Sequence, residues 1–463
     1  MGKTILLSWL ILTLNANTSM SQDALSGKPR TSALSAILAN FTKNPVNFFK
    51  EKAGVDAYSG YITVREKSHF FYVLMKTLSK TPDAPLILWL QGGPGRSGMF
   101  GQFLENGPVG IDAEGELFNR STTFVNFSDV LYIDYPAGGG LSIIEEASVL
   151  SKSLGDVTDD LLTFLKKFYL LFPDYLERPL YLGGESYGAR AAVSLAARMQ
   201  TACVNRPHGV MLFAGFLIPL GESILKSQEF LYQLSMVDEK GRSELAQMFA
   251  YIQTKAKNNT TEAAILLAAT VFNLKLGGRK SLFANLTGYD DQESVLHATK
   301  DPEVEQYMTY VNNSHFKGQL GIPKPEMVSL EGYRSAINFM LAPGDYFTSI
   351  DSMFQDVLQS QRVLILNGQM DDIFPPVLFE EYFSKMTWNG SELCKQTPRM
   401  PWKTPGSLYG LSGYIKECGN LTTAVALQAG HYVGFHASEP VYDAVKRFVN
   451  GLKYSDDKEK DIK

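Results

Sequence analysis

The sequence predicts an α/β domain with a mostly parallel central sheet, and two observations support this prediction. Six short apolar runs have the composition of strands that are buried on both faces: residues 86–90, 130–133, 179–182, 209–213, 363–366 and 424–427. Stretches with apolar residues at helical spacing, such as residues 156–168, separate these runs. Strands that alternate with helices are typical of α/β domains.

The chain has 463 residues, enough for one large domain with an insertion. Residues 58–78 alternate in a way that predicts an antiparallel hairpin at the sheet edge. Residues 219–360 differ, because their pattern is mostly helical and lacks clear buried strands. We therefore expect a core in two parts, residues 22–218 and 361–463, with residues 219–360 inserted as a helical cap over the strand ends.

Residues 1–21 predict a secretory signal peptide, because Lys3 precedes a short apolar run that small residues follow. The run is shorter than the about 20 residues that span a membrane. The charged C-terminal tail ends without an apolar anchor. We expect a protein of the secretory or lysosomal route without a membrane anchor, and a buried N-terminal helix is the alternative.

N-glycosylation sequons agree with this route. Beyond residue 21 they begin at Asn40, Asn119, Asn126, Asn258, Asn259, Asn285, Asn312, Asn389 and Asn420. Asn258 and Asn259 are adjacent, so we do not expect both to carry glycan.

Charge and cysteine content exclude other classes. The net charge is −5 without a basic stripe, so nucleic acid is not an expected partner. The three cysteines lie without clustered histidines, so neither a metal site nor a cofactor is expected. Cys394 and Cys418 flank one proline-rich stretch and form the preferred disulfide pair. Cys203 then has no disulfide partner and is expected to be either buried or free.

Ser186 is the candidate nucleophile. It lies within a G-E-S-Y-G motif between the run 179–182 and a strong helix former. Strand, sharp turn and helix in this order form a nucleophile elbow, in which flanking glycines leave room for the tight backbone. The alternative is an ordinary helix N-cap serine.

The base and the acid should follow the elbow, because the chain order in such folds is Ser, Asp, His. His431 ends the segment 428–431, which directly follows the run 424–427, and is the candidate base, with His436 as its local competitor. Asp371 and Asp372 follow the run 363–366, and either carboxylate could orient the imidazole.

Two N–H groups should stabilise the oxyanion that forms during acyl transfer. One is the N–H of Tyr187, the residue after the nucleophile, and the other belongs to the glycine-rich loop that follows the run 86–90. The alternative is that these glycines only make a tight turn.

These motifs together resemble those of the serine carboxypeptidase family, and most closely its vitellogenic carboxypeptidase-like branch. They run in family order over residues 45–450: Trp89-Leu-Gln-Gly-Gly-Pro-Gly, Glu105-Asn-Gly-Pro, Ile133-Asp-Tyr-Pro-Ala-Gly, Leu171-Phe-Pro-Asp-Tyr, Arg178-Pro-Leu-Tyr, Gly184-Glu-Ser-Tyr-Gly, Asn367-Gly-Gln-Met-Asp and Gly430-His. The resemblance implies an α/β-hydrolase fold and the release of single amino acids from peptide C-termini, usually at acid pH.

The resemblance also implies roles for single residues. It places Ser186, Asp371 and His431 in the catalytic triad, and thereby favours Asp371 over Asp372. It makes Gly93 and Tyr187 the oxyanion donors.

The site for the substrate's C-terminal carboxylate maps by resemblance onto Gln91, Gly92, Glu105 and Glu185. Two acids beside a carboxylate repel it unless they are protonated and donate hydrogen bonds. We therefore expect raised pKa values for Glu105 and Glu185 and a function that fades as the pH rises, which fits an acidic compartment.

The chain departs from the family pattern at several places. Arg96 stands where the family has a small residue or a cysteine; it pairs with Glu105, pairs with the substrate carboxylate, or points to solvent. Arg190, the segment 214–216 and the loop after His431 also differ, which indicates a rebuilt pocket.

We expect a secreted or lysosomal serine carboxypeptidase that acts on peptides. Two alternatives stay open at this point: an acyltransferase with the same acyl-enzyme chemistry, and a non-catalytic binding protein that kept the fold. Relatives are often dimers, so a homodimer is open as well.

Overall fold

The computed structural model describes residues 42–454 except residues 82, 203–204, 273–279, 291–292, 405–406 and 408–409. The predicted signal peptide, Asn40, Cys203 and the tail beyond residue 454 therefore lie outside the described residues.

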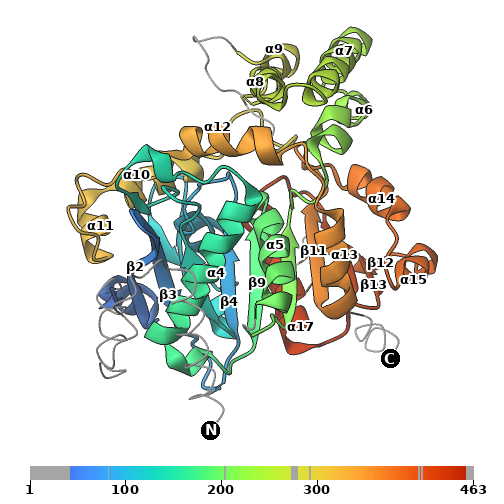
Figure 1. The fold of residues 1–463 in the computed structure, drawn as a ribbon. Helices are drawn as coiled ribbons and strands as arrows, with labels where there is room; N and C mark the ends of the chain where they lie inside the picture. The colour runs from blue at the N-terminus through green and yellow to red at the C-terminus, as the bar shows by residue number, and fades with distance from the viewer. Residues whose placement is uncertain are drawn as a thin grey trace.

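A 12-stranded sheet forms the centre of the described part of the chain (Figure 1). Its strands are β1 (Asn44–Pro45), β2 (Ala57–Arg65), β3 (Ser68–Met75), β4 (Leu86–Leu90), β7 (Asp129–Ile133), β8 (Ile143–Ile144), β9 (Leu180–Glu185), β10 (Gly209–Phe213), β11 (Arg362–Gly368), β12 (Met400–Trp402), β13 (Gly413–Cys418) and β14 (Leu421–Ala426). β5 (Val109–Ile111) and β6 (Leu117–Asn119) pair separately.

The strand order is β1-β2-β3-β7-β4-β9-β10-β11-β14-β13-β12, with β8 paired to β3. The six strands from β7 to β14 are parallel to one another, and both flanks are antiparallel. β2 and β3 form the predicted hairpin. The prediction of a mostly parallel central sheet is thus confirmed.

The central strands are apolar because both of their faces are buried. In β4, Leu86, Leu88 and Leu90 face one hydrophobic core, while Ile87 and Trp89 face the other. This alternation follows from the twofold side-chain period of a strand.

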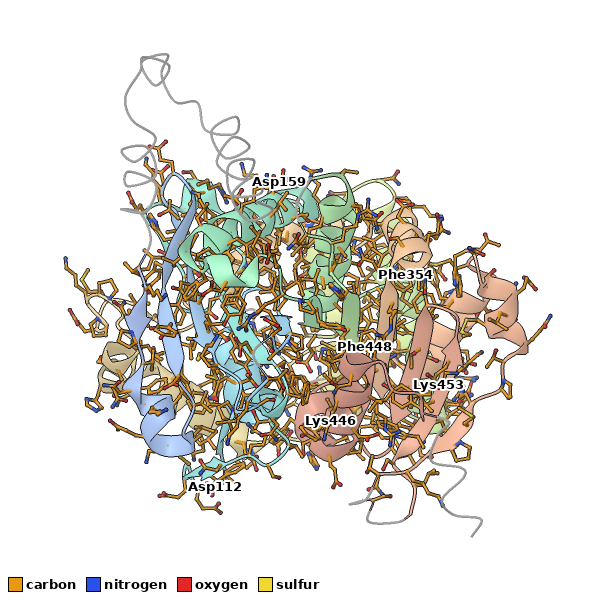
Figure 2. All side chains as sticks on the ribbon, turned by 90° about the horizontal axis from the view of Figure 1, so that it is seen from below. Asp112, Asp159, Phe354, Lys446, Phe448 and Lys453 are labelled. Carbon is orange, nitrogen blue, oxygen red and sulfur yellow. A yellow bond between two sulfur atoms is a disulfide. The ribbon has the colours of Figure 1, made fainter. Side chains whose placement is uncertain are left out.

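Helices cover both faces of the sheet. α4 (Leu154–Leu171), α5 (Tyr187–Thr201) and α13 (Asp351–Ser360) lie on one face and α17 (Ser438–Asn450) on the other. Figure 2 shows this arrangement, with Asp159 and Phe354 on the first face and Phe448 on the second. α4 begins with a capping box, in which Ser153 and Asp156 satisfy each other's backbone N–H groups.

The chain between β10 and β11 is helical. It comprises α6 (Gln228–Gln233), α7 (Glu239–Ala256), α8 (Thr260–Thr270), α9 (Leu282–Thr287), α10 (Pro302–Asn312), α11 (Ser314–Gln319), α12 (Arg334–Asp345) and α13. In Figure 1, α12 lies across the upper edge of the sheet, and α6 to α9 project beyond it.

Four short helices complete the core: α3 (Asn47–Ala53), α14 (Pro376–Lys385), α15 (Ser391–Gln396) and α16 (Val433–His436). Within the described residues, each helix is too short or too polar to cross a bilayer.

Candidate active site

Ser186 lies at the sharp turn between β9 and α5. Its φ of 56° and ψ of −120° form the strained turn that a nucleophile elbow requires. A Cβ on Gly184 would lie 2.2 Å from the carbonyl oxygen of Gly188, and one on Gly188 would lie 1.9 Å from that of Leu90. The flanking glycines are therefore required by close backbone approach. The side chain of Ser186 is half-buried, which leaves it open to a substrate.

His431 and Asp371 follow two neighbouring parallel strands, β14 and β11. The Nδ1 atom of His431 lies 3.0 Å from Oδ2 of Asp371. The other carboxylate oxygen of Asp371 accepts the N–H groups of Ile373 and Phe374, both at 3.0 Å. This fixes the carboxylate so that one oxygen is left for the imidazole. Of the two candidate acids, Asp371 is the one that holds this hydrogen bond.

The pKa of His431 is raised by its surroundings. Burial alone would lower it, but the charge of Asp371 and the hydrogen bond to it outweigh the burial. This environment stabilises the imidazolium that forms when the base takes up a proton.

Aromatic rings connect the elbow to the base. The ring of Phe374 lies 5.7 Å from that of His431 and stacks on Phe216 at 5.4 Å. The N–H of Phe216 in turn donates to the carbonyl oxygen of Ser186 at 2.9 Å. Ser186 and His431, the candidate nucleophile and base, thus belong to one packed cluster at the carboxyl ends of the strands.

The glycine loop after β4 lies against the elbow. A Cβ on Gly92 would lie 2.6 Å from Cβ of Ser186 and 3.2 Å from its Oγ. Gly93 has a φ of +116°, which favours glycine. The N–H of Tyr187 opens α5 on the other side of Ser186. Both predicted donor segments therefore flank the nucleophile.

Glu105 and Glu185 form a buried carboxyl pair. They are 2% and 1% exposed, and Gln91 donates to Oε2 of Glu185 at 2.5 Å. Trp89 orients Gln91 by donating to its amide oxygen at 2.7 Å. Burial raises the pKa of both acids, and the neighbouring Glu105 raises that of Glu185 further, so that it stands well above the usual range.

Arg96 does not point to solvent, because it is only 5% exposed. Its two nearest acids are Glu293 and Glu331, each at 4.0 Å, and none of its ion pairs involves Glu105. Its guanidinium donates to the hydroxyl of Tyr432 at 2.6 Å and lies over the ring of Phe100. A buried cation requires such partners, and the insertion supplies both acids.

Arg190, the second departure from the family pattern, is also fully buried and paired. It donates to Asp345 at the end of α12 at 2.7 Å. The hydroxyl of Tyr187 donates to the other oxygen of the same carboxylate at 2.8 Å. Sequence reasoning missed Asp345, Glu293 and Glu331; the only signal for them was that two unexpected arginines near the site needed acids.

The competitor histidine, His436, pairs with Asp301 and not with Asp371. Its Nε2 lies 3.0 Å from Asp301 in the insertion. His436, Asp301 and His297 lie close together, and these three types of side chain can all act as metal ligands.

The structure joins Cys394 and Cys418 by a disulfide, with their Cα atoms 5.1 Å apart. The sequon asparagines in the described part of the chain are exposed except for Asn126, which is half-buried. Asn126 donates from its side chain to the carbonyl oxygen of Ser121.

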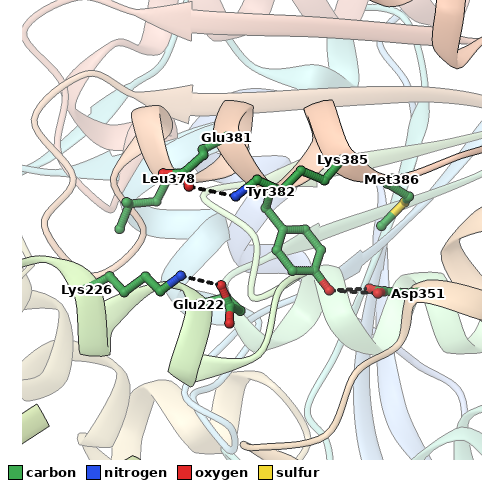
Figure 3. Close-up of a pocket in the computed structure, with 8 residues that line it drawn as sticks. All are labelled: Glu222, Lys226, Asp351, Leu378, Glu381, Tyr382, Lys385 and Met386. Atoms are coloured by element: carbon green, nitrogen blue, oxygen red, sulfur yellow. Dashed lines mark hydrogen bonds and ion pairs between the residues drawn. The ribbon is translucent and has the colours of Figure 1, made fainter. Parts of the chain in front are cut away.

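A separate surface cavity of about 230 Å³ lies between α13, α14 and the segment before α6 (Figure 3). None of the proposed catalytic residues lines it. Its polar groups pair with one another: Lys226 forms an ion pair with Glu222, and the hydroxyl of Tyr382 donates to Asp351. The cavity therefore lacks the features of a reaction site.

The chain is similar in sequence to known proteins over most of its length. A sequence model of the family described as serine carboxypeptidase matches residues 45–451. A venom serine carboxypeptidase of Apis mellifera is 31% identical over 418 residues, which cover 87% of this chain and 86% of the relative. The probable serine carboxypeptidase CPVL of Homo sapiens is 28% identical, with coverages of 85% and 83%. A vitellogenic carboxypeptidase of Aedes aegypti is 26% identical, with coverages of 86% and 84%.

Among solved structures, the prohormone-processing carboxypeptidase Kex1 of Saccharomyces cerevisiae is similar with a TM-score of 0.68. It is 20% identical and covers 86% of this chain and 92% of its own. This likeness supports the fold, which is that of an α/β-hydrolase.

Proposed function

The chain belongs to the serine carboxypeptidase family, and from this premise we propose that it releases C-terminal amino acids from peptides through an acyl-enzyme. The observation that carries the proposal is the hydrogen bond of His431 to a doubly anchored Asp371, beside a serine in an elbow. A fold alone does not require this constellation.

In the proposed reaction the hydroxyl of Ser186 attacks the last peptide carbonyl, and His431 takes up its proton. The N–H groups of Gly93 and Tyr187 stabilise the oxyanion. His431 then donates the proton to the leaving amino group, and the acyl-enzyme is hydrolysed by water with His431 again as the base. Asp371 holds the imidazole in the required tautomer throughout.

The carboxyl pair Glu105 and Glu185 would recognise the substrate's C-terminus. Only one of its four oxygens, Oε2 of Glu185, accepts a hydrogen bond from another side chain in the described part of the chain. Protonated carboxyls can donate to a substrate carboxylate, and the raised pKa values favour that form. This supports activity in an acidic compartment on the secretory or lysosomal route.

We further propose that residues 219–360 act as a cap on this site. Three contacts support this. α12 lies against the glycine loop, Glu293 accepts a hydrogen bond from Tyr432, and both Glu293 and Glu331 pair with Arg96. Substrate selection would then depend on the insertion.

The test is release of the last amino acid from N-blocked dipeptides between about pH 4 and 7.5, with Ser186→Ala as the control. Release at low pH that fades toward neutrality and is absent in Ser186→Ala supports the proposal. Labelling of Ser186 by a fluorophosphonate without peptide release would instead favour an acyltransferase. Neither labelling nor release from folded protein would favour the binding-protein alternative.

A further inference from the structure

His436 lies five residues after the proposed base and is joined to the insertion. Its Nε2 is 3.0 Å from one carboxylate oxygen of Asp301, and Nδ1 of His297 is 2.6 Å from the other. The side chain of His436 is 7% exposed and that of Asp301 16% exposed, whereas His297 is 51% exposed. The inner pair is therefore shielded from water and His297 forms the outer end.

The other ring nitrogen of His436 accepts a backbone hydrogen bond. The N–H of Gly430, directly before His431, points at Nδ1 of His436 at 3.1 Å. A backbone N–H can donate only to a ring nitrogen that carries a lone pair. Nδ1 is therefore unprotonated, and Nε2 carries the proton that faces Asp301.

This hydrogen bond acts on the loop that presents His431. The N–H of His431 itself donates to the carbonyl oxygen of Glu293 at 2.7 Å. A Cβ on Gly430 would lie 2.5 Å from the side chain of Ser294, so the backbone of the loop packs closely against the insertion. The N–H of Gly430 is thus held by His436, and the N–H of His431 is held by the insertion.

We propose that His436 is a positioning residue, which in its neutral form accepts the Gly430 N–H and thereby holds the loop of His431 in place. This inference rests on the proposed function of His431 as the base. Asp301 contributes by accepting a hydrogen bond from the Nε2–H group of His436, and this fixes the tautomer of the ring.

The same three residues could also be read as a metal site, because their ligand atoms lie within 4.8 Å of one another. A metal ion would need the lone pair of Nε2 of His436. The proton would then move to Nδ1, where it would face the N–H of Gly430. Two donors would oppose each other, so the geometry favours the proton over the metal.

Two substitutions test the roles of the two ring nitrogens of His436 one at a time. In His436→Asn the amide oxygen can take the place of Nδ1 and accept from Gly430, whereas His436→Gln reaches the place of Nε2 and loses that acceptor. We expect kcat to fall about 10-fold or more in His436→Gln, because small displacements of a catalytic group are costly. We expect His436→Asn to keep kcat within about threefold of wild type, since it keeps the acceptor for Gly430 and loses only the hydrogen bond to Asp301.

KM should change less than kcat in both variants, because His436 does not contact substrate in this proposal. His297→Asn is the matched control at the exposed end of the group, and it should leave kcat within about twofold. Equal activity of His436→Asn and His436→Gln, at any level, would overturn the inference while leaving the proposed function intact.

Hydrogen–deuterium exchange of peptides that cover residues 428–432 gives a readout that does not need activity. We expect the protection of wild type to be kept in His436→Asn and lost in His436→Gln. If wild type releases no amino acid, the proposed function fails, and this exchange still decides whether His436 holds the loop. Stabilisation of wild type, but not of His436→Asn, by added Zn²⁺ would overturn the tautomer assignment.

Discussion

Asn338 of α12 donates its side-chain N–H to the carbonyl oxygen of Pro94 at 3.0 Å, directly after the proposed oxyanion donor Gly93. Tyr346 orients Asn338 by donating to its amide oxygen at 2.5 Å. At its other end, α12 holds Tyr187 through Asp345. One helix of the segment between β10 and β11 therefore holds the segments on both sides of Ser186.

The first prediction concerns this helix. Asn338→Ala should lower kcat about fivefold, which corresponds to about 1 kcal/mol for the lost hydrogen bond. Binding of a peptidyl boronate should weaken by a similar factor, because a boronate resembles the tetrahedral intermediate. Asn450→Ala, which removes a similar side-chain hydrogen bond on the remote helix α17, is the control. A change in KM alone would contradict the prediction.

The second prediction separates the two candidate acids. Asp371→Asn should lower kcat about 10⁴-fold, because it fixes the wrong tautomer of His431. Asp372→Asn should cause a much smaller loss. Steady-state kinetics of both variants, with circular dichroism to show that both fold, provide the measurement. Similar losses in the two variants would refute the assignment of Asp371.

The third prediction concerns the pH profile. The raised pKa values of Glu105 and Glu185 set the alkaline limb, because the pair must be protonated to hold a carboxylate. We expect kcat/KM to fall as the pH rises through the pKa values of this pair.

Glu185→Gln should extend the alkaline limb of that profile, because an amide donates hydrogen bonds at any pH. An alkaline limb that Glu185→Gln and Glu105→Gln both leave unchanged would show that the carboxyl pair does not recognise the substrate.

The fourth prediction concerns stability. The folded protein binds protons at Glu105 and Glu185 more tightly than the unfolded chain does, since their folded-state pKa values are raised. This contribution to the free energy of unfolding is complete below the ordinary carboxyl pKa. It is lost as the pH rises through the folded-state values. Thermal unfolding between about pH 4 and 7.5 should therefore show a decline in stability that Glu185→Gln reduces. An unchanged pH slope in this variant would contradict the prediction.

The fifth prediction concerns Arg96. Arg96→Met removes the buried cation that Glu293 and Glu331 share, while Lys300 and Arg334 remain paired with them, and should lower the free energy of unfolding by about 1 to 3 kcal/mol. Lys385→Met removes a cation that pairs with Glu381 at the surface, and this control should cost much less stability than Arg96→Met. Urea unfolding measures both. Equal losses would mean that the surroundings of Arg96 do not depend on its charge.

The sequence predicts the central sheet well because its strands are buried on both faces and therefore read as continuous apolar runs. It does not predict β13, which carries polar residues such as Lys416 and Glu417, or β12, which has only three residues and includes Pro401. The sequence predicts the positions of Ser186, Asp371 and His431 because each lies in the turn or loop that follows a strand. The sequence does not predict the partners of Arg96 and Arg190. These partners, Glu293, Glu331 and Asp345, come from a helical segment whose position against the sheet cannot be inferred from local sequence patterns.

The pairing of β10 with β11 has a consequence for biosynthesis. These strands are parallel neighbours, with Gly209 opposite Arg362 and Phe213 opposite Leu366. Contacts between residues so distant in sequence form slowly, since a long loop must close first. Ser186 is made before this loop, whereas Asp371 and His431 come after it. A nascent chain thus carries the serine without its base until the sheet closes, and we expect a fluorophosphonate to label only chains that have completed this step.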